Sequence, residues 1–197
     1  MIKPIAVQVG ADQIPRLAKT LARAFQDEPA FSYIIPTAEK RRQSLQRAFP
    51  VFIREDFAKG LAFATPGGEA VTLWRAPGKA HDSLWDTIRL LPTFVSALGS
   101  GVLRGERVAR SIEHHLPKEP VWYLHFAGCD PAHQGKGIGG AAIRAGLARA
   151  DDDGIPAYLE TADPKNLGIY IALGFALVHE WDVSGGPHFW GMQRKPR

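Results

Sequence analysis

The feature that most constrains the fold is a strand that leads through a glycine-rich turn into an alanine-rich helix. Residues 121–129 form an apolar run of strand length, and a helical pattern extends from the turn to about residue 153. The turn consists of Gln134, Gly135, Lys136, Gly137, Ile138, Gly139 and Gly140. A helix N-terminus offers unpaired backbone N–H groups and about half a positive charge, and glycines let a phosphate approach the backbone. We therefore expect the chain to bind a phosphate-bearing cofactor at this turn.

The remaining hydrophobic patterns predict a mixed α/β fold. Strands are expected at 3–9, 61–64, 70–74, 121–129, 157–161, 177–182 and 188–194. Helices are expected at 11–25, at 37–58 with a bend at Pro50, within 81–115 on either side of 99–101, from the turn to about 153, and at 164–173. The unit 121–161 predicts a right-handed parallel crossover. A length of 197 residues fits one domain, so we expect residues 1–197 to form a single domain.

Charge and cysteine content narrow the range of partners. A net charge of +4 suits an anionic cofactor, but the basic residues are scattered, which argues against nucleic acid. The basic runs Lys40–Arg42 and Arg104–Arg110 resemble solvated helix faces. The single cysteine, Cys129, excludes an internal disulfide and fits a reducing compartment, so the expected location is the cytoplasm.

Other function classes are disfavoured by what the sequence lacks. The N-terminus has no apolar core of a secretion signal. No apolar run reaches the ~18 residues of a membrane span, so no membrane partner is expected. The seven histidines show no metal-ligand spacing, so no metal site is expected either.

Three phosphate-binding patterns compete for the glycine turn. The P-loop spacing is absent. The dinucleotide pattern Gly-x-Gly-x-x-Gly is met by Gly135, Gly137 and Gly140, and Glu160 follows about 20 residues later at a strand end. Against that pattern, residues 130–134 separate the glycines from the strand, and the chain after Glu160 is short for the rest of such a fold. An NAD(P)-binding oxidoreductase is therefore a weaker alternative.

The third pattern is Gln/Arg-x-x-Gly-x-Gly/Ala after a strand and the pair Asp-Pro. The turn matches it at Gln134, Gly137 and Gly139, and Asp130-Pro131 stands in place. A second motif lies downstream, where Asn166 is followed by Tyr170-Ile-Ala-Leu-Gly174-Phe175. Together the two motifs resemble the acetyl-CoA loop and the next-to-last helix of the GNAT (Gcn5-related) N-acetyltransferases.

The resemblance covers residues 121–194 strongly and implies the acyl-CoA N-acyltransferase fold. In that fold a mostly antiparallel twisted sheet, flanked by helices, contains a splayed parallel pair, here 121–129 and 157–161. Three short stretches are also similar to the puromycin acetyltransferase-like branch of the family, namely 72–78, 122–124 and 159–161.

The implied activity is direct transfer of an acetyl group from acetyl-CoA to a primary amine of a small molecule in a ternary complex. The glycine turn would hold the pyrophosphate, and the free edge of the splayed strand would pair with pantetheine. The resemblance assigns acetyl-CoA contacts to Ala127, Gly128, Cys129, Gln134, Gly135, Lys136, Gly137, Ile138, Gly139, Gly140, Asn166 and Tyr170. A non-catalytic acyl-CoA-binding module remains an alternative.

Tyr170 is the expected general acid, because an unperturbed tyrosine pKa of about 10 is close to that of a thiolate leaving group. The alternative is a core tyrosine that anchors its helix. The expected base is Glu160, with His125 or a proton loss before binding as alternatives. Cys129 is not expected to act as a nucleophile, because this chemistry needs none.

The acceptor site is expected on the segment 25–36 and on a helical insert at 79–117, where such pockets lie in the family. Candidate pocket aromatics, which could equally be core residues, are Phe31, Tyr33, Trp85, Phe94 and Trp190. Three carboxylates could attract a cationic amine or simply lie on the surface, namely Asp27, Glu28 and Glu113. A homodimer is possible, since dimers are common among the proteins that the chain resembles.

Overall fold

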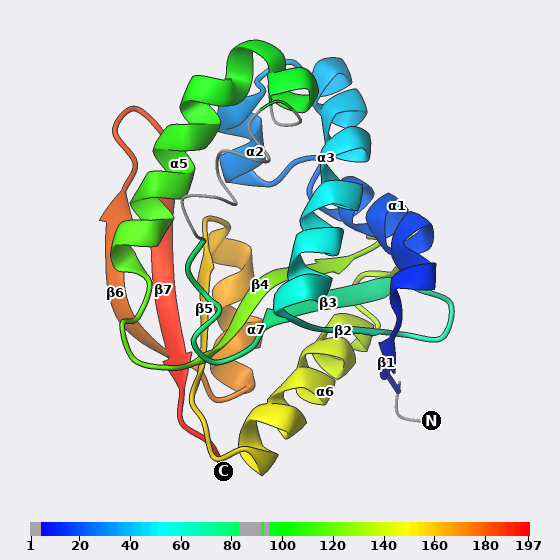
Figure 1. Cartoon of the computed structure of the whole chain (residues 1–197), viewed down its shortest axis with the longest axis vertical. Coiled ribbons are helices and arrows are strands. Elements are labelled where there is room, and N and C mark those ends of the chain that lie inside the picture. Colours follow the sequence, from blue (N-terminus) through cyan, green and yellow to red (C-terminus); the bar gives the residue numbers. More distant parts are fainter. Residues whose placement is uncertain (1–4, 83–91, 93–94) are drawn as a thin grey trace.

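The computed structural model describes residues 5–82, 92 and 95–197, and its strands form one seven-stranded sheet (Figure 1). The strand order is β1-β2-β3-β4-β5-β7-β6, and only β4 and β5 pair in parallel. The strands are β1 Val7–Val9, β2 Gly60–Ala64, β3 Ala70–Arg75, β4 Trp122–Cys129, β5 Ala157–Thr161, β6 Ala176–Asp182 and β7 His188–Arg194. The mixed, mostly antiparallel sheet confirms the predicted fold class.

The helices with described bounds follow the predicted order, with the short helix Pro29–Ile34 added between the first two. They are α1 Ile14–Ala24, α2 Pro29–Ile34, α3 Ala38–Lys59, α5 Val102–His115, α6 Ile138–Asp152 and α7 Leu167–Ala172. Short 3₁₀ turns lie at Ala11–Gln13, Gly99–Gly101, Pro131–His133 and Pro164–Asn166. Of the predicted strand 3–9, residues 3 and 4 lie outside the described residues, and the observed strand covers Val7–Val9, which pair with β2 and are exposed or half-buried. The first helix expected within 81–115 falls largely outside the described residues.

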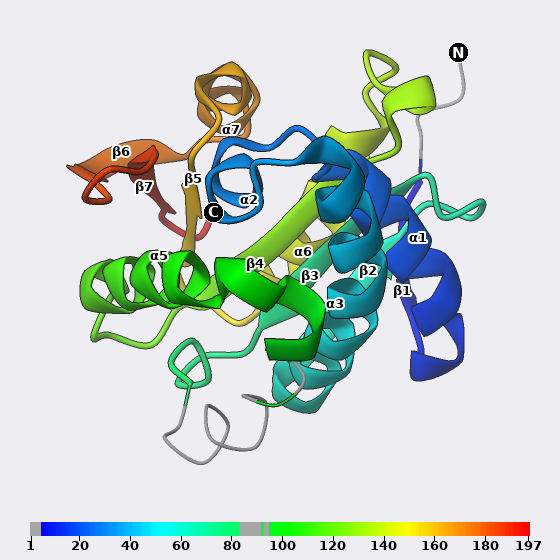
Figure 2. The ribbon, with the colours of Figure 1, turned by 90° about the horizontal axis from the view of Figure 1, so that it is seen from above.

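Alternation along the strands builds two hydrophobic layers, one on each face of the sheet. One face packs Ala62, Val71 and Leu73 against α1, α2 and α3. The other packs Phe63 and Trp74 against α6 and α7. Seen from above, α2 lies between the β5–β7 end of the sheet and helices α1 and α3 (Figure 2). Helices therefore cover both faces of the sheet. A ligand can reach the centre of the sheet only where neighbouring strands separate.

Strands β4 and β5 stay paired over only two residue pairs, Trp122 with Ala157 and Tyr123 with Tyr158. Beyond Tyr123 the two strands diverge, and β4 turns toward α1 while β5 runs along α7 (Figure 1). A register shift on the β3 side of β4 places Trp74 opposite Leu124 and Leu73 opposite Phe126, so His125 is the extra residue of a bulge. The splayed parallel pair implied by the resemblance is confirmed.

Arg41 corrects one expectation from the sequence, because it is not part of a solvated face. The residue is 6% exposed, and its guanidinium donates to the carbonyl oxygens of Gln26 and, at 2.7 Å, Ile35. Arg41 therefore ties α3 to both ends of the segment that carries α2. Arg104, half-buried on α5, donates to the carbonyl of Ile34 at 2.9 Å and holds the same segment from the other side.

Candidate active site

The glycine turn leads from β4 into the N-terminus of α6. Gly135 and Gly137 have φ angles of 75° and 73°, in the left-handed region that favours glycine. A Cβ on either residue would meet no atom within 4 Å, so the backbone conformation rather than crowding requires glycine here. Gly137 is the N-cap of α6 and provides no side-chain acceptor, which leaves the first-turn N–H groups available to an anion.

Polar contacts within the turn hold it against the end of β4. The carboxylate of Asp130 accepts a hydrogen bond from the amide of Ala132 at 3.0 Å, and the amide side chain of Gln134 donates to the carbonyl of Cys129 at 3.3 Å. Arg23 of α1 pairs with Asp130 at 3.1 Å. The side chain of Lys136 is exposed beside the turn, with Nζ 3.5 Å from the carbonyl oxygen of Ala132. Gln134 thus shapes the turn, and Lys136 can reach a bound anion.

The end of β4 approaches α1 closely at Gly128. A Cβ at Gly128 would lie 2.6 Å from Cδ2 of Leu21 and 3.0 Å from Cβ of Ala24, so glycine is required for helix–strand packing. The half-buried thiol of Cys129 donates to the carbonyl of Asp130 at 3.6 Å, and burial raises its pKa. A thiol with a raised pKa is a poor nucleophile. The β4 edge at Ala127–Cys129 therefore contributes backbone rather than reactive side chains.

Tyr170 on α7 is 7% exposed and packs edge-to-face on Phe175, with ring centroids 6.0 Å apart. Burial, together with the charges of Glu160, Asp163 and Glu28, raises its pKa well above the ordinary value. The hydroxyl is therefore a weaker acid than the sequence argument supposed, because its pKa no longer lies close to that of a thiolate leaving group. Asn166 occupies the N-cap of α7 but makes no capping bond through its side chain, which leaves its amide group available to a ligand.

Glu160 lies at the point where β4 and β5 separate. The hydroxyl of Tyr123 donates to Oε1 of Glu160 at 2.5 Å, whereas Oε2 is buried and has no hydrogen-bond partner in the described part of the chain. Burial raises the pKa of Glu160 to about 7, although the Tyr123 hydrogen bond opposes this shift. A buried carboxylate with one unpaired oxygen and a pKa near neutrality is suited to accept a proton.

His125, the alternative base, is held by a buried ion network. Asp56 of α3 accepts hydrogen bonds from Nδ1 of His125 at 2.8 Å and from Nε of Arg75 at 2.7 Å. Burial tends to raise the pKa of Asp56, but His125 and Arg75 outweigh this and lower it. Burial and Arg75 also lower the pKa of His125. Because a charged Asp56 needs a donor at Nδ1, the neutral imidazole carries its proton there and its lone pair on Nε2.

Glu28, which the sequence left open as an amine-attracting or a surface carboxylate, is half-buried. Its side chain caps α2 by accepting a hydrogen bond from the amide of Phe31 at 2.9 Å, and burial raises its pKa. The sequence did contain a cue, because an acidic residue before Pro29 is typical of a helix start. Asp27 and Glu113 are exposed and pair with Arg41 and His81. Glu28, Glu160 and Asp163 thus surround Tyr170 with acidic charge.

The aromatic residues expected in an acceptor pocket have different roles. Phe31 belongs to the hydrophobic core between the helices and the sheet. The hydroxyl of Tyr33 accepts a hydrogen bond from Arg107 at 3.0 Å, and the ring of Trp190 lies edge-on to His188. Trp85 and Phe94 lie outside the described residues. Among the residues that the structure describes, no cluster of His, Cys, Asp and Glu could hold a metal, and no helix could cross a membrane.

The glycine turn at a helix start, the splayed strands and Tyr170 all lie within one stretch of the chain, and a family model matches that stretch. The model is that of the Acetyltransferase (GNAT) family, and it covers residues 72–175. The chain belongs to this family. A GNAT acetyltransferase needs a mixed sheet with a splayed pair, whereas a dinucleotide-binding enzyme needs a mostly parallel one, so the NAD(P) alternative does not fit the structure.

Comparisons with individual proteins agree with the GNAT assignment. An uncharacterized N-acetyltransferase of Schizosaccharomyces pombe is 26% identical over 191 residues, which cover 86% of this chain and 73% of the yeast protein. A structure described as histone acetyltransferase HPA2 and related acetyltransferase from Corynebacterium glutamicum has a TM-score of 0.73 at 24% identity, covering 98% and 97% of the two chains. Arylalkylamine N-acetyltransferase 2 of Aedes aegypti has a TM-score of 0.66 at 12% identity, covering 99% and 100%. The protein is a GNAT N-acetyltransferase with the acyl-CoA N-acyltransferase fold.

Proposed function

We propose that this GNAT protein transfers an acetyl group from acetyl-CoA directly to a primary amine of a small molecule. The observation that carries the proposal is the arrangement of Tyr170 and Glu160, one a protonated hydroxyl and the other a carboxylate with an unpaired buried oxygen, at the splay between β4 and β5. In this assignment the backbone of residues 135–140 holds the pyrophosphate and the free edge at 127–129 pairs with pantetheine. Lys136 and Asn166 add side-chain contacts.

The proton transfers follow from the state of each side chain. As the amine nitrogen bonds to the acetyl carbon and the carbon–sulfur bond breaks, Glu160 accepts the amine proton through Oε2, since Tyr123 already occupies Oε1. Tyr170 donates a hydrogen bond to the departing sulfur and gives it the hydroxyl proton as negative charge develops there, although the raised pKa of Tyr170 opposes this transfer. Solvent then takes the extra proton from Glu160 and returns a proton to Tyr170. The products are an amide and a free thiol. A backbone N–H on the β4 edge polarises the carbonyl during attack.

The acidic surroundings of Tyr170 favour a cationic amine as the acceptor. Glu28, Glu160 and Asp163 all act on Tyr170, and each would attract a protonated amine toward the splay. In this proposal the described part of the insert at 95–117 forms the outer wall of the acceptor side. The single cysteine supports a cytoplasmic location. A homodimer remains one possible assembly. Membership of the puromycin acetyltransferase-like branch stays a prediction.

A thermal-shift comparison with acetyl-CoA, CoA, NAD and NADP tests donor binding. Stabilisation by the two CoA compounds, rising with concentration as mass action requires, is the expected result. Stabilisation by NAD without stabilisation by CoA would contradict the proposal. Release of free thiol from acetyl-CoA across a library of amines then separates an enzyme from a non-catalytic acyl-CoA-binding module, because only an enzyme releases thiol in an amine-dependent manner.

A further inference from the structure

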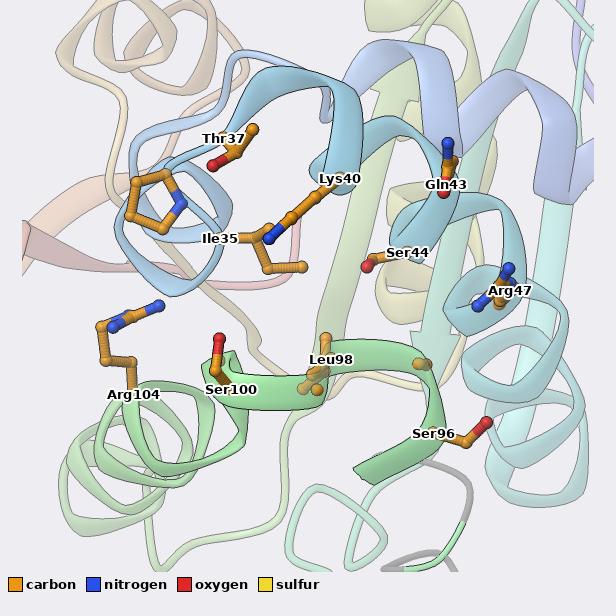
Figure 3. A pocket seen from close by; sticks show the side chains of 14 residues that line it. Ile35, Thr37, Lys40, Gln43, Ser44, Arg47, Ser96, Leu98, Ser100 and Arg104 are labelled. Carbon is orange, nitrogen blue, oxygen red and sulfur yellow. The ribbon is translucent and has the colours of Figure 1, made fainter.

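A concave region lies between α3 and the segment 96–104, and it is lined in part by the segments 25–36 and 79–117 on which the acceptor site is expected. Its cavity volume is about 380 Å³, which is the size of a small-molecule pocket. Lys40, Ser44 and Arg47 of α3 form one side, and Ser96, Leu98 and Ser100 face them from the opposite segment, as Figure 3 shows. Ile35, Pro36 and Thr37, which join α2 to α3, close one end.

The charge of this pocket is opposite to that around Tyr170. Three cationic side chains line it, Lys40, Arg47 and Arg104, and no carboxylate occurs among its 14 lining residues. In the described part of the chain, Lys40 and Arg47 make no ion pair that would neutralise them. A concave surface lined by one sign of charge concentrates its field in the cavity and raises the local concentration of the opposite ion. The pocket is therefore electrostatically suited to an anion.

The polar groups of the pocket are positioned as well as charged. The Nε of Arg104 donates to the carbonyl of Ile34 at 2.9 Å, which fixes the guanidinium at the pocket wall. Ser44 is 9% exposed, and its hydroxyl lines the pocket without a hydrogen-bond partner among the described residues. The hydroxyl oxygen itself is not enclosed by protein, so it can hydrogen-bond a ligand oxygen or water in the cavity (Figure 3). The hydroxyls of Ser96, Ser100 and Thr37 add further donors at the rim.

We propose that this pocket binds an anionic group of a small molecule, a carboxylate or a phosphate. This anionic group belongs either to the remote end of the acceptor amine or to a separate anionic molecule. The possibility that the anionic group belongs to the acceptor rests on the proposed acetyl transfer. The position of α2 supports this possibility, because the N-terminus of α2 carries Glu28 beside Tyr170 and its C-terminus leads into the pocket. A six-residue helix spans about 9 Å, so an amine with an anionic tail on the order of 10 Å long could reach both ends.

Direct binding tests the pocket without any catalytic step. Inorganic phosphate and succinate are titrated calorimetrically into protein saturated with CoA, which occupies the glycine turn. The double variant Lys40→Gln/Arg47→Gln removes two pocket charges, and Arg42→Gln on the same helix, exposed and paired with Glu39, is the matched control. We expect binding to weaken at least about tenfold in the double variant and less than about twofold in the control. Absence of binding, or equal loss in both variants, would overturn the proposal.

Kinetics with matched acceptors separate the two sources of the anionic group. Pairs of amines that differ only in a terminal carboxylate or phosphate are compared in the native protein and in Lys40→Gln/Arg47→Gln. A KM that rises only for the anionic member assigns the pocket to the acceptor. Unchanged KM values with weakened phosphate binding assign it to a separate anionic molecule. If no amine is acetylated, the proposed function fails while the phosphate titration still decides the anion site.

Discussion

The donor half and the acceptor half of the proposed active site are built differently. The donor half consists mainly of one continuous stretch, 127–140, in which two glycines at positive φ and a helix start present backbone N–H groups. The acceptor half brings together side chains that are far apart in sequence, including Glu28, Asp56, His125 and Glu160. The difference indicates that donor binding depends on backbone conformation, whereas acceptor chemistry depends on buried charges whose pKa values are set by long-range packing.

The largest effect is expected where the two halves meet, at Tyr170. Replacement by Phe removes the proton donor while keeping the ring that packs on Phe175, so we expect kcat to fall by about 10²–10⁴. Free-thiol release measures the rate, and calorimetry should show nearly unchanged CoA affinity. The control is Tyr158→Phe, whose hydroxyl contacts His179 rather than the splay. Full turnover by Tyr170→Phe would remove Tyr170 as the acid.

The buried ion network of the acceptor half should dominate stability. Asp56→Ala leaves the buried guanidinium of Arg75 with only the half-exposed Asp82 as a carboxylate partner, so we expect a loss of about 3 kcal/mol in the free energy of unfolding. Denaturant titration measures this. Asp27→Ala is the control, because Asp27 is exposed although its partner Arg41 is buried, and it should change stability by less than about 0.5 kcal/mol. Equal losses in the two variants would argue against a special role for the network.

Glu160 should give the acceptor half its pH dependence. Because its pKa is raised to about 7 and the ionised form is the base, kcat/KM should rise with pH through neutrality. Glu160→Gln should lower kcat/KM by about a hundredfold and abolish that part of the pH profile for the same acceptor. If the profile keeps its shape in Glu160→Gln, the proton goes instead to another group such as His125 or is lost before binding.

The smallest effect is expected in the donor half, where only backbone conformation changes. Gly137→Ala places a Cβ in the left-handed region at a cost of about 1–2 kcal/mol, so CoA binding should weaken by about tenfold or more. Gly168→Ala is the matched control, since Gly168 lies in α7 with open space around it and no positive φ. Acceptor KM at saturating acetyl-CoA should stay unchanged in Gly137→Ala. A larger change in the acceptor KM than in the dissociation constant of CoA would contradict the division into a donor half and an acceptor half.

The same division explains what the sequence could predict. The glycine turn, the Tyr170 helix and the strand order depend on local patterns, and the structure confirms the fold that they implied. The burial of Arg41 and of the Glu28 carboxylate depends on how α2 packs between α1, α3 and α5, which local spacing does not encode, although an acidic residue before Pro29 does indicate the helix start. The pairing of Asp56 with His125 joins residues 69 positions apart, and no periodicity reports such a contact.

Amine-dependent thiol release tests the central claim most directly. Acetyl-CoA is incubated with the protein and a panel of amines, and the release of free thiol is followed over time. The acetylated products are identified by mass spectrometry. The account predicts that free thiol and acetylated amine appear in a 1:1 ratio with at least one amine and that neither forms without an acceptor. Tight CoA binding with no acetylated product from any amine, or an acetyl group left on the protein instead, would contradict it.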